Sequence, residues 1–313
     1  MDAALRALMT GVIDYAGLFP PARLPLDPAI RNYAAYRAGA DAFMLGRFVI
    51  PAARLPELDP FAAELFPDDP AHPFRFAALG RGGTDPVDFL AGLDADLAAM
   101  RSFEARHRER VAVDVLETRL PVDVVNDAAA LAGLLDEALP RIGAVRPFFE
   151  VPLAGDWRQV LDAAIDALGA TGGSAGFKLR TGGLEAAAFP SCEQVAAALI
   201  ACREAQVPFK ATAGLHHPLP RRDETVQATM HGFLNVFGGG ALAFLRGLSE
   251  VQLAGILEQQ DAACFRFEDG HFRAGAWAVG ADEIVRARRE AVLSFGSCSF
   301  DEPRQDLAAL GLT

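Results

Sequence analysis

The chain alternates between short apolar runs and longer, alanine-rich amphipathic segments from residue 11 to residue 237. The runs have the length of buried strands and are bounded by Gly, Pro or charged residues, whereas the segments between them have the length and composition of helices. Strands that alternate with helices predict a parallel sheet with both faces covered. Eight runs predict strands, at residues 11–15, 42–50, 74–79, 111–117, 147–151, 176–180, 208–212 and 233–237.

Eight strand–helix units over about 250 residues favour a closed (β/α)8 barrel of the TIM type over an open sheet. An open, doubly wound sheet usually carries a glycine-rich GxGxxG turn after its first strand. The turn at residues 15–21 lacks this motif. We therefore expect an α/β barrel, with helices that include residues 28–38, 86–106, 127–139, 156–169 and 191–205.

The pattern changes after residue 260. Residues 265–273 alternate with period two around Asp269-Gly270, which is a strong hairpin signal, and residues 282–293 predict a helix. No internal repeat or low-complexity linker marks a second independent domain. We therefore expect the barrel in residues 1–260, and in residues 261–313 a C-terminal hairpin, helix and tail packed on it, as a lid or as an oligomer contact.

Composition narrows the class of protein. The chain has 313 residues, is 51% hydrophobic and is long enough for a large core. Its formal net charge of −12 argues against a nucleic-acid partner. Four widely spaced cysteines suit the reduced thiols of a cytoplasm, and we find neither a leader pattern nor a membrane-spanning apolar stretch. These features predict a soluble, cytoplasmic, bacterial-type enzyme with a small-molecule substrate and no membrane partner; homo-oligomer formation stays open.

Only two of the 29 basic residues are lysines, Lys178 and Lys210. Guanidinium does not deprotonate at physiological pH, whereas an ammonium group can be tuned to a nucleophilic amine. The two lysines lie near the C-terminal ends of the strands at 176–180 and 208–212, which a helix joins in a βαβ unit, so the strands should be neighbours. We expect the charge of Lys210 to lower the pKa of Lys178 so that its amine attacks a carbonyl. The alternative is two ordinary cations paired with carboxylates.

Other polar groups gather at the same strand ends, where barrel enzymes place their catalytic groups. Arg180 shares a strand face with Lys178, and its planar fork suits a carboxylate, as in an α-keto acid. The strand register at Glu117 against Asp114 is ambiguous by one residue. The acid/base candidates are Asp14, Glu117 and Glu150, and the substrate-binding candidates at strand ends are Arg47, Arg180, Thr212 and Asn235.

Three consecutive glycines and three histidines add further hypotheses. Gly238, Gly239 and Gly240 end the eighth run and open a helix, so their N–H groups are candidates for binding phosphate. Imidazole titrates near neutrality, so a histidine near the strand ends is a candidate for moving protons. The histidines also predict an alternative, a divalent-metal-dependent hydrolase or lyase, although neither HxH nor HExxH spacing occurs and we assign no metal. The proton-transfer candidates are His216 and His217, and the metal alternative adds His231.

The segment Lys178-Leu179-Arg180-Thr181-Gly182, followed about 32 residues later by Lys210, resembles the deoxyribose-phosphate aldolase group of class I aldolases. The resemblance covers about 40 residues. It implies that Lys178 forms the Schiff base, that Lys210 is its electrostatic partner and that no cofactor is needed. In that group, small residues with hydroxyl side chains follow the first lysine, whereas in this chain Leu179 and Arg180 follow Lys178. We therefore expect an aldolase-type carbon–carbon lyase for a small anionic carbonyl compound, a sugar phosphate or keto acid; a non-catalytic, anion-binding barrel is the other alternative.

Overall fold

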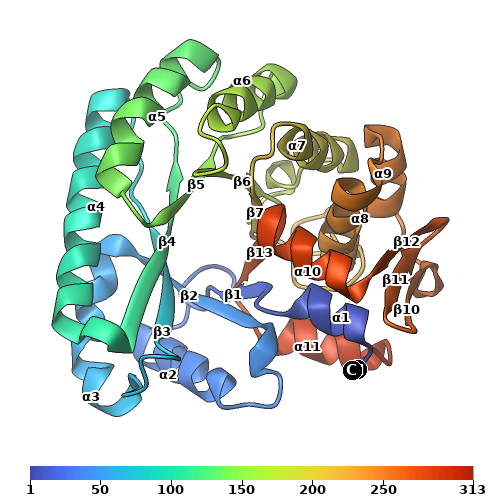
Figure 1. Ribbon diagram of the computed structural model, residues 1–313, viewed down its shortest axis with the longest axis horizontal. Helices are drawn as coiled ribbons and strands as arrows, with labels where there is room; N and C mark the ends of the chain where they lie inside the picture. The colour runs from blue at the N-terminus through green and yellow to red at the C-terminus, as the bar shows by residue number, and fades with distance from the viewer. Residues whose placement is uncertain (313) are drawn as a thin grey trace.

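Seven of the eight predicted runs form parallel strands in the computed structural model, which describes residues 1–312. With one further strand they close into a barrel in the order β1-β13-β7-β6-β5-β4-β3-β2 (Figure 1). The prediction of a (β/α)8 barrel is confirmed. The barrel strands are β1 (Ile13–Tyr15), β2 (Leu45–Pro51), β3 (Phe74–Leu79), β4 (Val111–Arg119), β5 (Arg146–Glu150), β6 (Gly176–Arg180), β7 (Phe209–Thr212) and β13 (Val292–Ser297).

Helices surround the strands, and local sequence explains where several of them begin (Figure 1). The Asp85 side chain accepts hydrogen bonds from the first turn of α4, which has Pro86 in that turn. Ser191 and Gln194 cap α7 reciprocally. The α-helices are α1 (Ala3–Met9), α2 (Leu26–Arg37), α3 (Ala62–Leu65), α4 (Pro86–His107), α5 (Ala128–Ile142), α6 (Trp157–Gly169), α7 (Cys192–Glu204), α8 (Gly239–Arg246), α9 (Glu250–Leu257), α10 (Ala281–Glu290) and α11 (Asp301–Ala309).

The run at residues 233–237, predicted as the eighth strand, is helical. It forms a π-helical turn, Leu234–Gly238, that continues directly into α8. Strand β13 takes the predicted position and pairs with β1 and β7. The rings of Phe233 and Phe237 pack on Phe295 of β13, with centroid separations of 5.5 and 5.4 Å. Because this segment is buried on all sides, Asn235 is its one polar residue, and one polar position does not reveal a helical period.

The barrel therefore extends past the boundary predicted at residue 260, because β13 completes it. The segment between β7 and β13 carries two antiparallel sheets besides α8, α9 and α10. The hairpin predicted around Asp269-Gly270 is confirmed, and both residues have the positive φ that a tight hairpin turn needs. The two sheets are β8 (Arg221–Asp223) with β9 (Ala228–Met230), and β10 (Phe265–Glu268) with β11 (His271–Ala274) and β12 (Trp277–Gly280).

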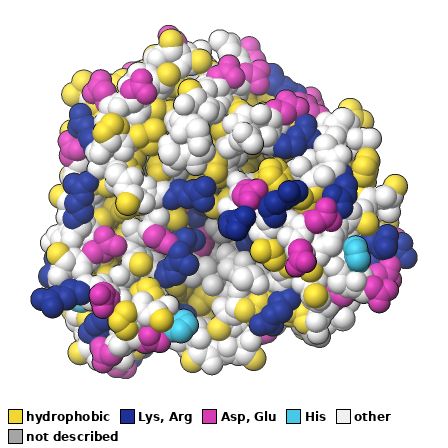
Figure 2. All heavy atoms as spheres, in the orientation of Figure 1, with side chains coloured by type: hydrophobic (Ala, Val, Ile, Leu, Met, Phe, Trp, Pro, Cys, Tyr) yellow, Lys and Arg dark blue, Asp and Glu magenta, His cyan; other side chains and the backbone are white. Residues whose placement is uncertain are grey.

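The second of these sheets lies at the edge of the molecule, beside α8 and α10 (Figure 1). The molecular face in Figure 2 shows basic and acidic side chains interspersed, with hydrophobic side chains visible between them.

Among residues 1–312, no helix combines the length and the apolarity that crossing a bilayer requires.

The closure of the barrel by β13 can be tested by truncation. A chain that ends at residue 290 lacks β13 and leaves β1 and β7 with unpaired edges, so we expect it to lose cooperative thermal unfolding. A chain that ends at residue 299 keeps β13 and should retain a cooperative transition at a lower Tm. Circular dichroism during heating measures both. A cooperative transition of the shorter chain near the Tm of the full chain would contradict closure by β13.

Candidate active site

Lys178 and Lys210 stand directly opposite each other on the neighbouring strands β6 and β7. Both side chains point into the barrel and are almost fully buried, with 2% and 1% of their surface exposed. Glu150 on β5 is the partner of Lys178 in the next register pair, and Ser294 on β13 is the partner of Lys210. The strand register thus aligns polar side chains from four successive strands at one level of the barrel. The prediction that the two lysines are neighbours is confirmed.

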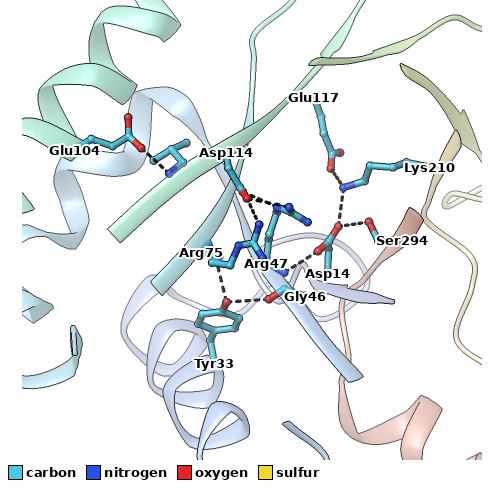
Figure 3. A network of polar contacts seen from close by, with 11 residues as sticks. Asp14, Tyr33, Gly46, Arg47, Arg75, Glu104, Asp114, Glu117, Lys210 and Ser294 are labelled. Atoms are coloured by element: carbon cyan, nitrogen blue, oxygen red, sulfur yellow. Dashed lines mark hydrogen bonds and ion pairs between the residues drawn. The ribbon is translucent and has the colours of Figure 1, made fainter. Parts of the chain in front are cut away.

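The carboxylate of Glu117 on β4 lies between the two ammonium groups. Its Oε2 is 3.0 Å from Lys178 Nζ, and its Oε1 is 2.7 Å from Lys210 Nζ. Lys210 also contacts Asp14 Oδ2 on β1 at 2.6 Å, and Figure 3 shows these side chains pointing toward one another. The two lysines therefore share a carboxylate, so their mutual repulsion is offset by attraction to Glu117. Ion pairing, the alternative to a bare lysine pair, is present in the structure.

The residues around Asp14 provide hydrogen-bond donors for its carboxylate and leave space for it. Ser294 Oγ donates to Asp14 Oδ2 at 2.7 Å, and the Arg47 N–H donates to Asp14 Oδ1 at 2.6 Å. Gly46 leaves room for this carboxylate, because a Cβ there would collide with Asp14 Oδ1. Asp14 is fully buried, so these contacts and Lys210 are what makes its charge tolerable.

Glu150 connects Lys178 to two arginines. Its Oε2 lies 3.1 Å from Lys178 Nζ, and its Oε1 accepts hydrogen bonds from the Nε atoms of Arg119 and Arg180, both at 3.0 Å. Glu150 Oε2 accepts no aligned hydrogen bond within residues 1–312. Electrostatic attraction therefore keeps Glu150 Oε2 near Lys178 Nζ, and the lone pairs of this oxygen can accept a proton.

The charges of this cluster set the pKa values of three members. Burial opposes the charge of Glu117, but Lys210 and Lys178 outweigh burial and lower its pKa to about 2. Burial likewise opposes the charge of Glu150, and Lys178, Arg180 and Arg119 together lower its pKa below the usual value. Burial also opposes the charge of Lys210, yet Asp14 and Glu117 raise its pKa. Lys210 is therefore a permanent cation near neutral pH.

A bulge in β4 resolves the ambiguity between Asp114 and Glu117. The pairing with β3 shifts at this point, where Phe76 pairs with Val113 and Ala77 with Val115. Asp114 is left without a pairing partner and binds the guanidinium of Arg47 at 2.6 and 2.9 Å, apart from the lysines. Glu117 is the carboxylate that faces Lys178. One extra residue in the strand explains why simple alternation could not separate the two.

A cavity of about 660 Å³ opens above the cluster at the C-terminal ends of the strands. Lys178, Glu117 and Glu150 line it, whereas Lys210 lies below and does not. Arg180 and Thr212 line it as well, in agreement with their prediction as strand-end groups. This volume is typical of sites for small molecules. Of the two amines, only Lys178 is placed to reach a molecule in the cavity.

Several cavity residues were not singled out from the sequence. Arg119 lies two residues beyond Glu117 on the same strand face, and the predicted strand ended before it. Cys298 follows β13, whose position was wrongly predicted; burial raises the pKa of its thiol, which makes it a weak nucleophile. Phe189 comes from the loop after β6. The β8–β9 hairpin contributes Asp223, Thr225, Val226 and Met230.

The predicted histidines are tied to different parts of the structure. His216 lines the cavity, and its Nδ1 lies 3.0 Å from Glu302 on α11. The Nδ1 of His217 lies 2.6 Å from Asp306 on the same helix. His231 donates to the carbonyl of Pro190 at 2.8 Å, and burial lowers its pKa.

These placements bear on the two roles predicted for histidine. In the described part of the chain, no three His, Cys, Asp or Glu side chains are grouped as a metal site would require. The metal-dependent alternative therefore has no ligand set among residues 1–312. His216 is the one histidine of the three that reaches the cavity.

The predicted phosphate-binding glycines lie away from the cavity. Gly238 ends the π-helical turn, and Gly239 and Gly240 begin α8; all three are buried, with helical backbone angles at Gly238 and Gly239. A Cβ on Gly240 would collide with Val292 at the first position of β13, the strand end opposite the cavity. The prediction that these glycines bind phosphate was wrong because the run before them is helical and not the eighth strand. The helix therefore has no free N-terminus at these residues. The glycines allow close packing of helix and barrel.

Two further substrate-binding candidates also have structural roles. The side-chain amide of Asn235 donates to the carbonyls of Ile256 and Gln259, both at 2.8 Å, at the C-terminal end of α9. The guanidinium of Arg47 binds Asp114, as Figure 3 shows. Neither side chain lines the cavity above Lys178. The side chains of Asn235 and Arg47 are therefore not placed to contact a molecule bound there.

Comparison with known proteins agrees with the fold. No family model and no curated protein sequence matches the chain. A solved structure from Toxoplasma gondii ME49, described as a candidate deoxyribose-phosphate aldolase, aligns with a TM-score of 0.50 and 13% identity over 98% of this chain and 93% of its own. A tetrameric deoxyribose-phosphate aldolase from Aeropyrum pernix aligns with a TM-score of 0.44 and 13% identity over 69% and 86%. At 13% identity, the likeness to the Toxoplasma gondii structure concerns the fold alone, and the chemistry has to be argued from the residues.

Replacing Glu117 by Gln tests the ion cluster, because Lys178 and Lys210 then lose the carboxylate they share. We expect the free energy of unfolding at pH 7 to fall by about 3–5 kcal/mol. The folded-state pKa of Glu117 is about 2, below its ordinary 4.5, so its stabilisation is present above pH 4.5 and is lost as the pH falls toward 2. The difference between wild type and E117Q should therefore shrink below pH 4.5. Urea titrations at several pH values measure this difference.

The exposed Glu109 provides the matched control. Glu109→Gln should change the free energy of unfolding by less than about 0.5 kcal/mol at every pH. A loss in E117Q that stays constant from pH 7 to pH 3 would contradict the assignment of the stabilisation to the charge of Glu117.

Proposed function

We propose that this protein is a Schiff-base-forming lyase of the aldolase type, in which Lys178 reacts with a small anionic carbonyl compound. The observation that carries the proposal is the placement of Lys178. Its amine lies at the base of a cavity of about 660 Å³, within ion-pair distance of Glu117 and Glu150, while a second lysine is buried beneath it. The scarcity of lysine elsewhere in the chain supports a chemical role for this pair.

In the proposed reaction, the neutral amine of Lys178 adds to the carbonyl carbon. The carbonyl oxygen leaves as water, and an iminium ion remains. The carbon next to the iminium carbon is bonded to a further carbon that carries a hydroxyl group, and the bond between these two carbons then breaks. The hydroxyl group gives its proton to a base and becomes the carbonyl group of the departing fragment. The bonding electrons form an enamine, which takes up a proton at carbon and is hydrolysed by water to release the second product and free Lys178.

The two carboxylates beside Lys178 suit this sequence of charges. An iminium ion carries its positive charge at the position of the former ammonium nitrogen, so Glu117 and Glu150 can stabilise both. The lowered pKa of each carboxyl keeps both carboxylates ionised. Lys210 keeps its proton and, through its contact with Glu117, holds that carboxylate between the two amines.

Glu150 and His216 are the candidates for moving protons. Glu150 Oε2 faces Lys178 and has lone pairs without an aligned donor in residues 1–312. His216 lines the same cavity and is oriented by Glu302. His217 contacts Asp306 and is not among the lining residues, so it supports the loop instead.

An anion-binding barrel without catalysis is the second candidate function. The observation that favours it is the pair of arginines, Arg119 and Arg180, that line the cavity together with Lys178. A binding protein needs this charge and the cavity, but it does not need a reactive amine.

Borohydride trapping separates the two functions. In the presence of an accepted aldehyde or keto acid, borohydride should reduce the imine and leave one stable adduct, which peptide mass analysis places on Lys178. The variant Lys178→Arg keeps the charge and should give no adduct. Lys210 lies outside the cavity and should remain unmodified in both proteins.

A melting curve of the variant shows whether it is folded. If no carbonyl compound of a broad panel modifies either lysine of the wild type, the Schiff-base proposal fails. Stabilisation of such an unreactive chain by phosphate or a carboxylate would favour the anion-binding barrel.

A further inference from the structure

A second cavity, of about 440 Å³, adjoins the one above Lys178. Its walls come from the end of β4 and from the loops that follow β4, β5 and β6. The two cavities share four residues of their walls. Three of the four are linked by hydrogen bonds, because Glu150 accepts from both Arg119 and Arg180. The shared residues are Arg119, Glu150, Arg180 and Phe189.

Each of the two guanidinium groups uses one of its three nitrogens for Glu150. Arg119 and Arg180 donate through Nε, and their terminal nitrogens make no hydrogen bond within residues 1–312. Their side chains are 66% and 38% exposed, so the terminal nitrogens are accessible from the cavities. The bond to Glu150 fixes the direction of each fork before a ligand arrives, which lowers the entropy cost of binding.

The charge around Glu150 favours an anion. Lys178, Arg119 and Arg180 all contact this single carboxylate, which leaves an excess of positive charge at the partition between the cavities. Lys178 already shares Glu117 with Lys210. An incoming carboxylate at the terminal nitrogens would complete the pairing of the two arginines, and planar carboxylates match guanidinium forks in two parallel hydrogen bonds.

We infer that Arg119 and Arg180 bind the carboxylate of a 2-oxo acid whose keto carbon reacts with Lys178. This inference rests on the proposed function and narrows its substrate class from sugar phosphates and keto acids to keto acids. Arg119 is thereby a specificity-determining residue, and it acts together with Arg180 on one group of the substrate. The alternative anion is a phosphate carried several bonds from the carbonyl.

The position of the arginines selects the carboxylate. Both arginines and Lys178 Nζ contact the same carboxylate, that of Glu150, so the group that the arginines bind must lie close to the atom that the amine attacks. In a 2-oxo acid the carboxylate is bonded directly to the keto carbon. Gly238, Gly239 and Gly240, which would favour a distant phosphate, are buried where the π-helical turn continues into α8.

The test compares pyruvate with methyl pyruvate, which has the same keto carbon and no negative charge. The concentration of each compound that gives half-maximal borohydride adduct at Lys178 is measured for wild type, Arg119→Gln and Arg180→Gln. Loss of a charged hydrogen-bond pair predicts an increase of about 10-fold or more for pyruvate in each variant, and less than about 2-fold for methyl pyruvate. For Arg→Lys variants at the same positions, the half-maximal concentration of pyruvate should lie between those of the wild type and of the Gln variants. Lysine keeps the positive charge but lacks the planar guanidinium fork.

Arg81 offers a matched control. It lines the same cavity, but its Nε and one terminal nitrogen bind Asp96 at 3.0 and 2.9 Å. Arg81→Gln should therefore leave the half-maximal concentrations of both compounds within about 2-fold of wild type, which shows that the effect does not arise from net charge alone. A 10-fold increase for pyruvate in this variant would overturn the assignment to Arg119 and Arg180.

The remaining outcomes separate this inference from the proposed function. Equal increases for pyruvate and methyl pyruvate in the Gln variants overturn the inference, as does tighter trapping of glyceraldehyde 3-phosphate than of pyruvate by the wild type. Absence of any adduct, with every compound, rejects the Schiff-base function. In that case, a rise in Tm with pyruvate that disappears in both Gln variants still supports the carboxylate site, and no rise overturns it.

Discussion

The interior of the barrel depends on how its buried charges are matched. Moving a single ammonium or carboxylate group out of water costs several kcal/mol, and this cost is offset only when its partners are close and well placed. Lys178 contacts Glu117 and Glu150, and Lys210 contacts Asp14 and Glu117, so each cation has two anions. Glu117 belongs to both pairs. Glu117 on β4 therefore couples the charge of Lys178 on β6 to that of Lys210 on β7.

This cluster constrains positions that carry no charge. Gly46 has no side chain where the carboxylate of Asp14 needs space, and Gly176 leaves room for the ring of Phe148. That ring in turn lies beneath Lys210, with the ammonium nitrogen 5.4 Å from its centroid. Small residues, an aromatic face and a strand bulge at Asp114 together let five ionisable side chains lie side by side inside a parallel barrel. The cavity above Lys178 is then the region in which a ligand can approach an amine already surrounded by charge.

Much of the architecture could be predicted from the sequence, because the apolar runs that alternate with amphipathic segments correspond to buried strands. Seven strands and the two neighbouring lysines follow from that pattern and from the rarity of lysine. The eighth strand could not be identified in this way. The run at 233–237 is apolar because it is a buried helical segment, whereas β13 includes Ser294, Gly296 and Ser297 and resembles a loop.

The same error explains most of the site residues that were misplaced. With the eighth strand placed too early, the glycines that follow it were assigned to phosphate, and Asn235 to the substrate. The partners of side chains could not be predicted either. That Arg119 and Arg180 meet on Glu150, or that His216 and His217 contact α11, depends on segments that are distant in the chain.

The place of β13 in the chain has a consequence for biosynthesis. This strand ends at Ser297 and pairs with β1, which ends at Tyr15, so this seam of the barrel joins two segments that are far apart in the sequence. The barrel can therefore close only after synthesis has passed β13, and such long-range pairing is intrinsically slow. Until then, the edges of β1 and β7 are open to other chains, and the nascent protein is in its most aggregation-prone state.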